Sequence, residues 1–275
     1  MTETQLYDLF SRANELLRHD AGGEKPVVAA WGLMNAGKSY LLNMLTDHIQ
    51  TECFRTRDVR ETAELKQFET SSYIFLDTPG LDANQDDDAI AHQGAAKADV
   101  VLFVHQPQGE FEKIEVDFLR SLKASFGEYA EQNIILILSK VDSEDAAKID
   151  AIEKRMLEQC QKELNFQPRC FQISGIRFHN GVQQNIEGLV RASHMQELKV
   201  HLNTLKVDSH SVKYARQRLA LDEMIAEIER AEQTVLQTKI ATENALARDF
   251  VPFNRAIATL SEALNNKTNN YHSLS

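Results

Sequence analysis

One stretch near the start of the chain decides the fold: VVAAWGLMNAGKSYLLNML, residues 27–45. Residues 27–31 are apolar, as in a buried strand, and residues 40–45 have the apolar spacing of a helix. Between them, Gly32 to Ser39 fit the spacing GxxxxGK[ST], in which two glycines let the backbone curl around phosphate and the helix N-terminus adds partial positive charge. The stretch therefore predicts a phosphate-binding loop, with Lys38 reaching the terminal phosphates and Ser39 ligating Mg²⁺. The competing interpretation is a glycine turn beside an exposed lysine.

Further apolar runs follow the first strand at residues 73–76, 100–104, 134–138 and 171–173. They are continuously hydrophobic, as are strands that helices cover on both faces. Helical periodicity fills residues 110–126 and 144–165 between them, and another strand is expected at 63–70. The pattern predicts an α/β fold with a doubly wound, mostly parallel sheet.

The two ends of the chain have a different residue pattern from the middle. Residues 1–22 carry one apolar stripe and predict an amphipathic helix, and the strand signals stop at about residue 196. We therefore expect an α/β domain over 25–195, with the helix at 1–22 and a helical region over 196–275 bundling into a neck. Pro252 is expected to end or kink the long helix, with a shorter helix over 253–264 and a frayed tail after it.

Two motifs at strand ends bear on which nucleotide binds. The strand at 73–76 leads into DTPG, where Asp77 can hold a Mg²⁺-bound water and Gly80 leaves its N–H free for a γ-phosphate. The strand at 134–138 leads into Ser139-Lys140-Val141-Asp142. The Asp142 carboxylate can accept both the ring N–H and the exocyclic amine of guanine, a pair of donors that adenine lacks, and the Lys140 stem would pack over the base. The motifs favour guanine.

Two more positions are expected to complete the site. Ser174 and Gly175 follow the last strand, where a backbone N–H can meet the guanine O6. A threonine that senses the γ-phosphate should lie between Lys38 and the strand at 73–76; Thr62 is the preferred candidate and Thr56 competes with it.

In this order, the motifs over residues 26–195 resemble the GTPase branch of the P-loop proteins. The resemblance implies GTP or GDP with Mg²⁺, held by Gly32, Met34, Asn35, Ala36, Gly37, Lys38, Ser39, Tyr40, Ser139, Lys140, Asp142, Ser174 and Gly175. It implies catalytic roles for Lys38, Ser39, Thr62, Asp77, Gly80 and Asn35, and metal ligation by Ser39, Thr62 and Asp77. Two positions depart from the pattern. Ser139 replaces the usual Asn or Thr, which is expected to loosen nucleotide affinity, and Ser174-Gly175-Ile176 is a poor match to the SAK-like final motif.

Leu81 stands where Ras-type enzymes place a water-orienting glutamine. Asn35 stands at the asparagine of GxxNxGKS, which is similar to potassium-stimulated and dynamin-like GTPases, so K⁺ is a candidate second cation. The other interpretation is that Asn35 only shapes the loop.

The strings NAGKSYLLNML and DTPGLDAN, with the leading and trailing helices, resemble the head of a bacterial dynamin-like protein. That resemblance implies a helical neck and head dimerisation across GTP. Members of this family usually carry several hundred further residues of trunk and membrane-binding tip. We therefore expect a fragment, a reduced member or a component that needs a helical protein partner, with only indirect contact with membranes.

Two other classes of function compete. An Era-type GTPase in ribosome or RNA maturation would need a basic accessory surface, whereas the chain has a formal net charge of −11 and residues 196–275 hold ten Lys and Arg against ten Asp and Glu. Nucleic acid is therefore a disfavoured partner. A GTP-gated binding module without turnover is the third class, which Leu81 keeps open. The acidic N-terminus lacks a signal-peptide pattern, so a cytoplasmic location is expected, and His105 is expected at the surface or at a helix cap.

Overall fold

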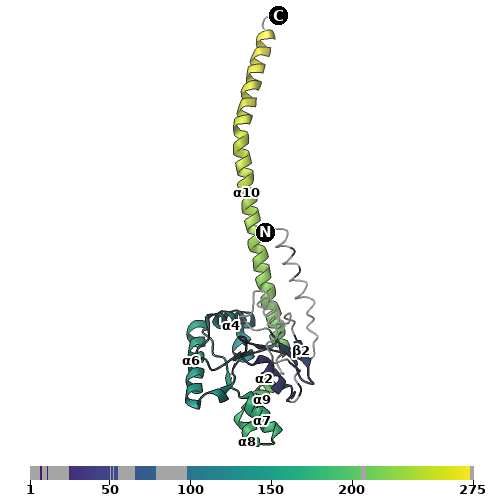
Figure 1. Ribbon diagram of the computed structural model, residues 1–275. Coiled ribbons are helices and arrows are strands. Elements are labelled where there is room, and N and C mark those ends of the chain that lie inside the picture. The colour runs from purple at the N-terminus through teal and green to yellow at the C-terminus, as the bar shows by residue number, and fades with distance from the viewer. Residues whose placement is uncertain are drawn as a thin grey trace. The chain divides into compact units, whose positions relative to one another are not determined.

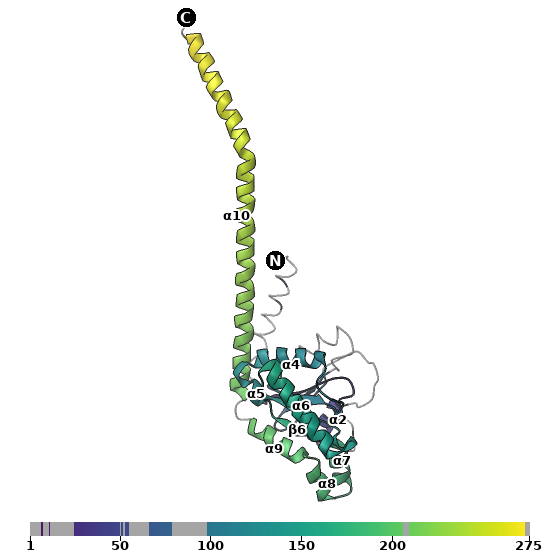
Figure 2. The same ribbon diagram turned by 90° about the vertical axis from the view of Figure 1, so that its left-hand side faces the viewer.

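The computed structural model describes residues 25–49, 51, 53–54, 66–78, 98–205 and 209–272, together with Tyr7 and Ser11. The helix expected over 1–22, the candidates Thr56 and Thr62, and the positions Gly80 and Leu81 lie outside the described residues. Figures 1 and 2 show the described part from two directions.

A six-stranded sheet, ordered β2-β3-β1-β4-β5-β6, forms the centre of the α/β domain. Its strands are β1 (Val27–Trp31), β2 (Lys66–Glu69), β3 (Ile74–Asp77), β4 (Val100–His105), β5 (Ile134–Leu138) and β6 (Cys170–Gln172). All neighbouring strands are parallel except the edge pair β2 and β3. The predicted doubly wound sheet is confirmed, and each apolar run lies within one residue of the strand it predicted.

Helices connect the strands and cover the sheet. They are α2 (Lys38–Leu45), α4 (Lys113–Phe126), α5 (Ala130–Asn133), α6 (Ala146–Leu164), α7 (Gly175–Gln183), α8 (Glu187–Ala192), α9 (Met195–Leu205) and α10 (Ser209–His272), with short 3-10 turns η1 (Gly127–Tyr129) and η2 (Val141–Ser143). The first turn of α4 is fixed by a capping box, in which Glu112 and Glu115 each accept a hydrogen bond from the other's backbone N–H.

Two hydrophobic cores lie on opposite faces of the sheet, because successive side chains of each strand point to opposite sides. Ala29 and Trp31 of β1 pack in the core that α4 and α6 cover, where the rings of Trp31 and Phe118 stack with centroids 4.3 Å apart. Val28 and Ala30 pack in the core that α2, α7 and α9 cover. Figures 1 and 2 show these two groups of helices on either side of the sheet.

The compact unit that contains the sheet runs from His19 to Ala220, which differs from the domain end expected at residue 195. Helix α9 explains the difference, because its apolar stripe is buried in the second core: Met195, Leu198, Leu202 and Leu205. The start of α10 is also fixed to this unit. There the Arg216 guanidinium lies 3.9 Å from the ring centroid of Phe126 and donates a hydrogen bond to the Ala98 carbonyl oxygen.

Residues 1–18 and 221–275 form a second compact unit. Within it, α10 continues through Pro252 to His272, so the helix does not end at Pro252. The predictions of a separate helix over 253–264 and of a frayed tail were wrong up to His272. A proline removes one backbone donor, and a long helix can continue past that loss when the turns on either side remain bonded. The Thr268 hydroxyl donates to the Leu264 carbonyl oxygen at 2.9 Å, one turn back.

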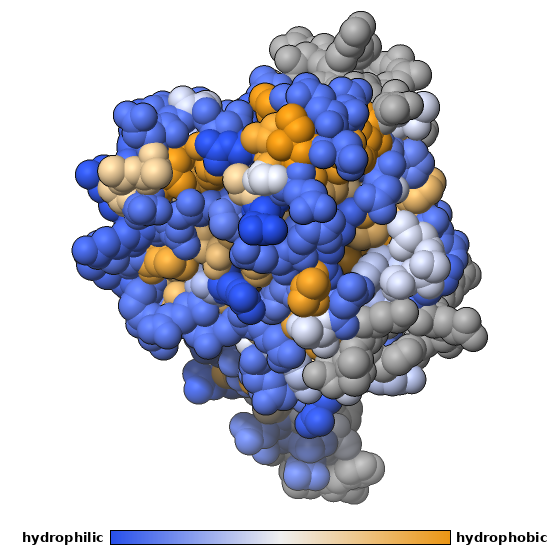
Figure 3. Space-filling model, turned by 90° about the horizontal axis from the view of Figure 1, so that it is seen from below, coloured by the Kyte–Doolittle hydropathy of each residue, from blue (hydrophilic) through white to orange (hydrophobic). Residues whose placement is uncertain are grey.

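The domain face on the side of α7, α8 and α9 is mostly hydrophilic, with scattered hydrophobic patches (Figure 3). Exposed apolar side chains on these helices include Ile176, Val182 and Val200. Among the helices that the structure describes, none is both long enough and hydrophobic enough to cross a bilayer.

Candidate nucleotide-binding site

The loop between β1 and α2 has a backbone that requires glycine at two points. Gly32 has a φ of +146°, and a Cβ there would lie 2.0 Å from the Val104 carbonyl oxygen. Gly37 has a φ of +94° and precedes the first turn of α2. Asn35 also adopts a left-handed φ, +62°, which Asn tolerates better than most residues. The loop is therefore shaped by backbone conformations that the GxxNxGKS spacing permits.

Lys38 lies at the centre of this loop. Its side chain is buried, and the Nζ donates hydrogen bonds to the carbonyl oxygens of Gly32 at 3.0 Å and Leu33 at 2.9 Å. These contacts hold the ammonium group under the loop whose N–H groups were expected to surround a phosphate. A glycine turn beside an exposed lysine, the competing interpretation, does not describe this geometry.

Ser39 and Asp77, which the sequence predicts to ligate a metal ion, are in direct contact. The Ser39 hydroxyl donates to Asp77 Oδ2 at 2.6 Å, and the buried Oδ1 of Asp77 has no hydrogen-bond partner in the described part of the chain. Burial raises the pKa of the Asp77 carboxyl, against the opposing effects of the Ser39 hydrogen bond and the Lys38 charge. A hydroxyl beside a carboxylate with an unpaired oxygen fits the oxygen ligands that Mg²⁺ prefers.

Asp142 lies in η2, after β5, and is oriented by Ser174. The Ser174 hydroxyl donates to Asp142 Oδ1 and accepts a hydrogen bond from the Arg177 N–H at 3.1 Å, which caps α7. Because Ser174 is fully buried, this double contact fixes the carboxylate relative to α7. The serine of the poorly matching final motif therefore has a defined structural role.

The guanine motif and the phosphate loop are joined directly. Lys140 Nζ donates to the Asn35 carbonyl oxygen at 2.7 Å and to Gln106 Oε1 at 3.2 Å. The Ser139 hydroxyl donates to the Ala36 carbonyl oxygen at 2.7 Å, and the Ser139 N–H donates to the His105 carbonyl oxygen at 2.8 Å. The structure thus places the loop that begins at Gly32 beside the motif that contains Asp142, although 105 positions separate Asn35 from Lys140.

A pocket of about 310 Å³ lies between these two motifs. Its lining includes six predicted site residues and three apolar neighbours: Gly37, Tyr40, Ser139, Lys140, Asp142 and Gly175, with Leu41, Ile173 and Ile176. The predicted residues at 32–39, 139–142 and 174–175 therefore gather at one edge of the sheet, with Asp77 at the same edge beside Ser39. Thr62 and Gly80 lie outside the described residues and stay predictions.

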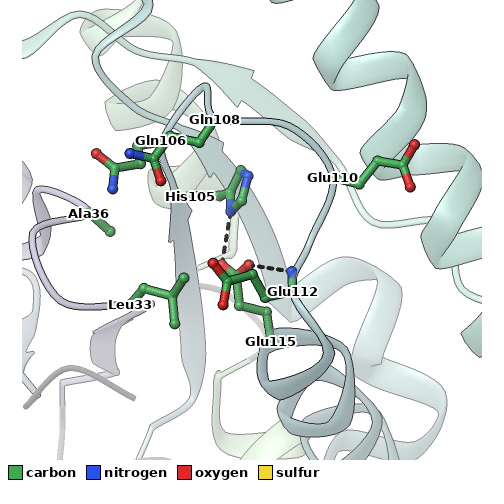
Figure 4. A pocket seen from close by; sticks show the side chains of 8 residues that line it. All are labelled: Leu33, Ala36, His105, Gln106, Gln108, Glu110, Glu112 and Glu115. Carbon is green, nitrogen blue, oxygen red and sulfur yellow. Dashed lines mark hydrogen bonds and ion pairs between the residues drawn. The ribbon is translucent and has the colours of Figure 1, made fainter. Parts of the chain in front are cut away.

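A second, smaller hollow of about 170 Å³ lies between the phosphate loop, the end of β4 and the start of α4 (Figure 4). Leu33 and Ala36 line it from the phosphate loop, and His105 and Glu115 line it as a bonded pair, with Nδ1 and Oε1 2.8 Å apart. His105 is buried, so its expected place at the surface or at a cap was wrong. The partner was hidden in the sequence because Glu115 lies ten residues away, and the only signal was the Glu112-x-x-Glu115 spacing at the helix start.

Comparison with protein families shows which domains this site resembles. Residues 27–140 match the family model described as 50S ribosome-binding GTPase. Over these residues, the chain is similar to that GTPase family. The match covers the phosphate loop, Asp77 and the first part of the guanine motif, and it ends at Lys140.

Two curated relatives match part of the chain. An uncharacterized protein of Acinetobacter baylyi is 28% identical over 233 residues, which cover 82% of this chain and 54% of the relative. The GTPase Era of Clostridium tetani is 26% identical over 125 residues, which cover 43% of this chain and 41% of the relative. The chain therefore spans about half the length of the curated relatives it matches.

Two solved structures described as an oligomerised bacterial dynamin pair share the fold. One superposes with a TM-score of 0.53 at 14% identity, covering 95% of this chain and 50% of the other. The second superposes with a TM-score of 0.52 at 16% identity, covering 97% of this chain and 60% of the other. At these identities the likeness concerns the fold.

Proposed function

We propose that this protein binds GTP and hydrolyses it to GDP with Mg²⁺. The observation that carries the proposal is the bond between Lys140 Nζ and the Asn35 carbonyl oxygen, which joins the guanine motif to the phosphate loop at 2.7 Å. A single nucleotide can then lie with its phosphates on the loop and its base in the 310 Å³ pocket.

The site residues that the structure describes have separate roles in this proposal. Lys38 neutralises charge on the terminal phosphates, and the base edge is read by Asp142. Ser39 and Asp77 would hold Mg²⁺, which supplies charge neutralisation on the phosphate oxygens when bound. Thr62 and Gly80 are proposed to contact the γ-phosphate and Thr62 also the metal.

Asn35 is proposed to bind K⁺ beside the phosphates. Its exposed position on the phosphate loop supports access to a cation, whereas its left-handed φ of +62° supports the simpler role in shaping the loop. Turnover in potassium compared with turnover in sodium separates the two roles.

We further propose a dynamin-like mode of action, in which two GTPase domains associate across bound nucleotide and the helices of residues 1–22 and 196–275 respond as a neck. The fold similarity to the bacterial dynamin pair supports this proposal, as does the long helix α10. A helical protein partner and indirect membrane contact follow from the same similarity.

A role in ribosome or RNA maturation is the second candidate function. The match to the 50S ribosome-binding GTPase model and the similarity to GTPase Era favour it. The net charge of −11 opposes it, because an acidic surface repels the phosphate backbone of RNA.

Calorimetric titration with GTP, GDP and ATP tests the nucleotide proposal, which requires guanine nucleotides to bind and ATP to compete poorly. Single-turnover hydrolysis is then followed at rising protein concentration, in potassium and in sodium, with and without RNA. A rate per molecule that rises with protein concentration supports head dimerisation, and RNA stimulation supports the second candidate. If GTP binds but is not hydrolysed, the proposed hydrolysis is overturned, and the protein is instead a GTP-gated binding module.

A further inference from the structure

Tyr40 and Gly175 form a close contact at the wall of the base pocket. Tyr40 is the third residue of α2, and its hydroxyl lies 3.5 Å from the Gly175 carbonyl oxygen. A Cβ on residue 175 would lie 2.4 Å from Tyr40 Cε1 and 2.7 Å from Cδ1. The ring can occupy this place only because residue 175 has no side chain.

The ring faces the pocket that we assign to the base. Tyr40 lines the 310 Å³ cavity together with Asp142, Lys140 and Ile176. Burial, and in second place the negative charge of Asp142, raise the pKa of the Tyr40 phenol. The ring therefore lies within electrostatic reach of the carboxylate that is proposed to read the edge of guanine, while the cavity remains open beside it.

We propose that the Tyr40 ring is an aromatic wall that holds the guanine base by surface contact, and that Gly175 is the residue that admits it. This inference rests on the proposed guanine-nucleotide binding. A purine presents a flat, apolar face, and aromatic contact with that face adds binding free energy without reading hydrogen bonds. The pair Tyr40 and Gly175 thus contributes affinity for the base, whereas Asp142 determines which base is bound.

The test measures GDP affinity by calorimetry for five variants of the full chain, four single and one double. Tyr40→Ala is expected to weaken GDP binding by about tenfold or more, the range found when a base loses an aromatic contact. Tyr40→Phe keeps the ring and is expected to retain most of the GDP affinity that Tyr40→Ala loses. Tyr214→Ala removes an exposed tyrosine on α10 and serves as the matched control. A loss in Tyr40→Phe equal to that in Tyr40→Ala overturns the wall, because the phenol would then act by positioning Asp142.

Gly175→Ala is the fourth variant. It tests the placement of the Tyr40 ring without removing the ring. Its Cβ forces the Tyr40 ring into the cavity, so GDP affinity is expected to fall. Combined with Tyr40→Ala, the same change is expected to have little further effect, because the clashing ring is absent. Independent, additive losses in this double-mutant cycle overturn the inference.

The two levels of the proposal fail in different ways. A parent protein that does not bind GDP overturns the proposed function itself. A parent that binds GDP, with Tyr40→Ala unchanged and folded by circular dichroism, overturns only the aromatic wall.

Discussion

The Ser139 hydroxyl donates a hydrogen bond to the carbonyl oxygen of Ala36 at 2.7 Å, so the first residue of the guanine motif is fastened to the phosphate loop. Ser139 is buried, and its backbone N–H is bonded to the His105 carbonyl oxygen. A serine at this position therefore keeps a direct link between base and phosphate sites, although it departs from the usual Asn or Thr.

Ser139→Ala tests that link. Removing the hydroxyl leaves the Ala36 carbonyl without this donor, so GDP affinity is expected to fall by about fivefold, the equivalent of ~1 kcal/mol for one hydrogen bond. Calorimetry measures the change. Ser121→Ala is the control, because the Ser121 hydroxyl donates only to the Phe118 carbonyl oxygen on α4. Equal GDP affinity in both variants would show that the contact between Ser139 and Ala36 does not contribute to GDP binding.

Asp142→Asn is expected to shift the binding preference of the protein from guanine nucleotides to xanthine nucleotides. An amide presents a donor where the carboxylate presents an acceptor, so GDP should lose about 100-fold or more in affinity while xanthosine diphosphate gains. Ser174 can still donate to the amide oxygen, so the loop should keep its position. Competition binding with both nucleotides measures the switch. Asp145→Asn, three residues along on an exposed position, should bind GDP as the parent does.

Asp77 makes the stability of the protein depend on pH in an unusual direction. Burial raises its pKa in the folded chain, so the folded state binds the proton more tightly than the unfolded state, and stability falls as the pH rises from the ordinary value toward the raised one. Above that range, Asp77→Asn should raise the melting temperature of the nucleotide-free protein by about 2–4 °C, the shift that ~1 kcal/mol produces in a domain of this size.

The same variant should lose the Mg²⁺-dependent part of GTP binding. Thermal melts between pH 4 and 8, at intervals of about one pH unit, check the stability prediction, and GTP titrations with and without Mg²⁺ check the binding prediction. Asp117→Asn, on an exposed carboxylate paired with Arg120, supplies the control. A lower melting temperature for Asp77→Asn at neutral pH would show that the ionised carboxylate stabilises the empty site.

The parallel strands and the phosphate loop could be predicted because their signals are local. A buried strand is a short apolar run, and the loop is a fixed spacing of Gly, Lys and Ser between a strand and a helix. Chain order then placed Asp77 and Asp142 at the same edge of the sheet, because parallel strands end on the same side.

Contacts between distant segments could not be predicted. The bond from Lys140 to Asn35 and the pairing of His105 with Glu115 depend on how β4, β5 and the phosphate loop meet. The sequence predicts α9 to be part of the neck because an amphipathic pattern does not say which surface a helix covers, whereas the structure packs α9 on the sheet. The helix does not end at Pro252, because one missing donor is a small local loss in a helix of 64 residues.

Glu115→Ala is expected to destabilise the domain. It leaves the buried His105 ring and the partly exposed Glu112 N–H without the acceptor that Glu115 provides, at a cost of roughly 1–3 kcal/mol for the buried ring. Urea unfolding monitored by circular dichroism measures the loss. Glu110→Ala changes an exposed glutamate of the same segment and should leave the midpoint in place. Matching midpoints for the two variants would mean that water replaces the lost acceptor.

Gly32→Ala is expected to be the most damaging single-methyl change in the phosphate loop. The new Cβ would meet the Val104 carbonyl oxygen at 2.0 Å, and the φ of +146° is one that alanine rarely adopts. Either the loop moves off β4 or the strand shifts, and both displace the N–H groups proposed to surround phosphate. GDP binding should therefore be lost and the melting temperature lowered. Gly188→Ala, in α8 with open space around the added methyl group, should match the parent in both measurements. Retained GDP affinity in Gly32→Ala would show that the phosphates do not depend on the close approach of this loop to β4.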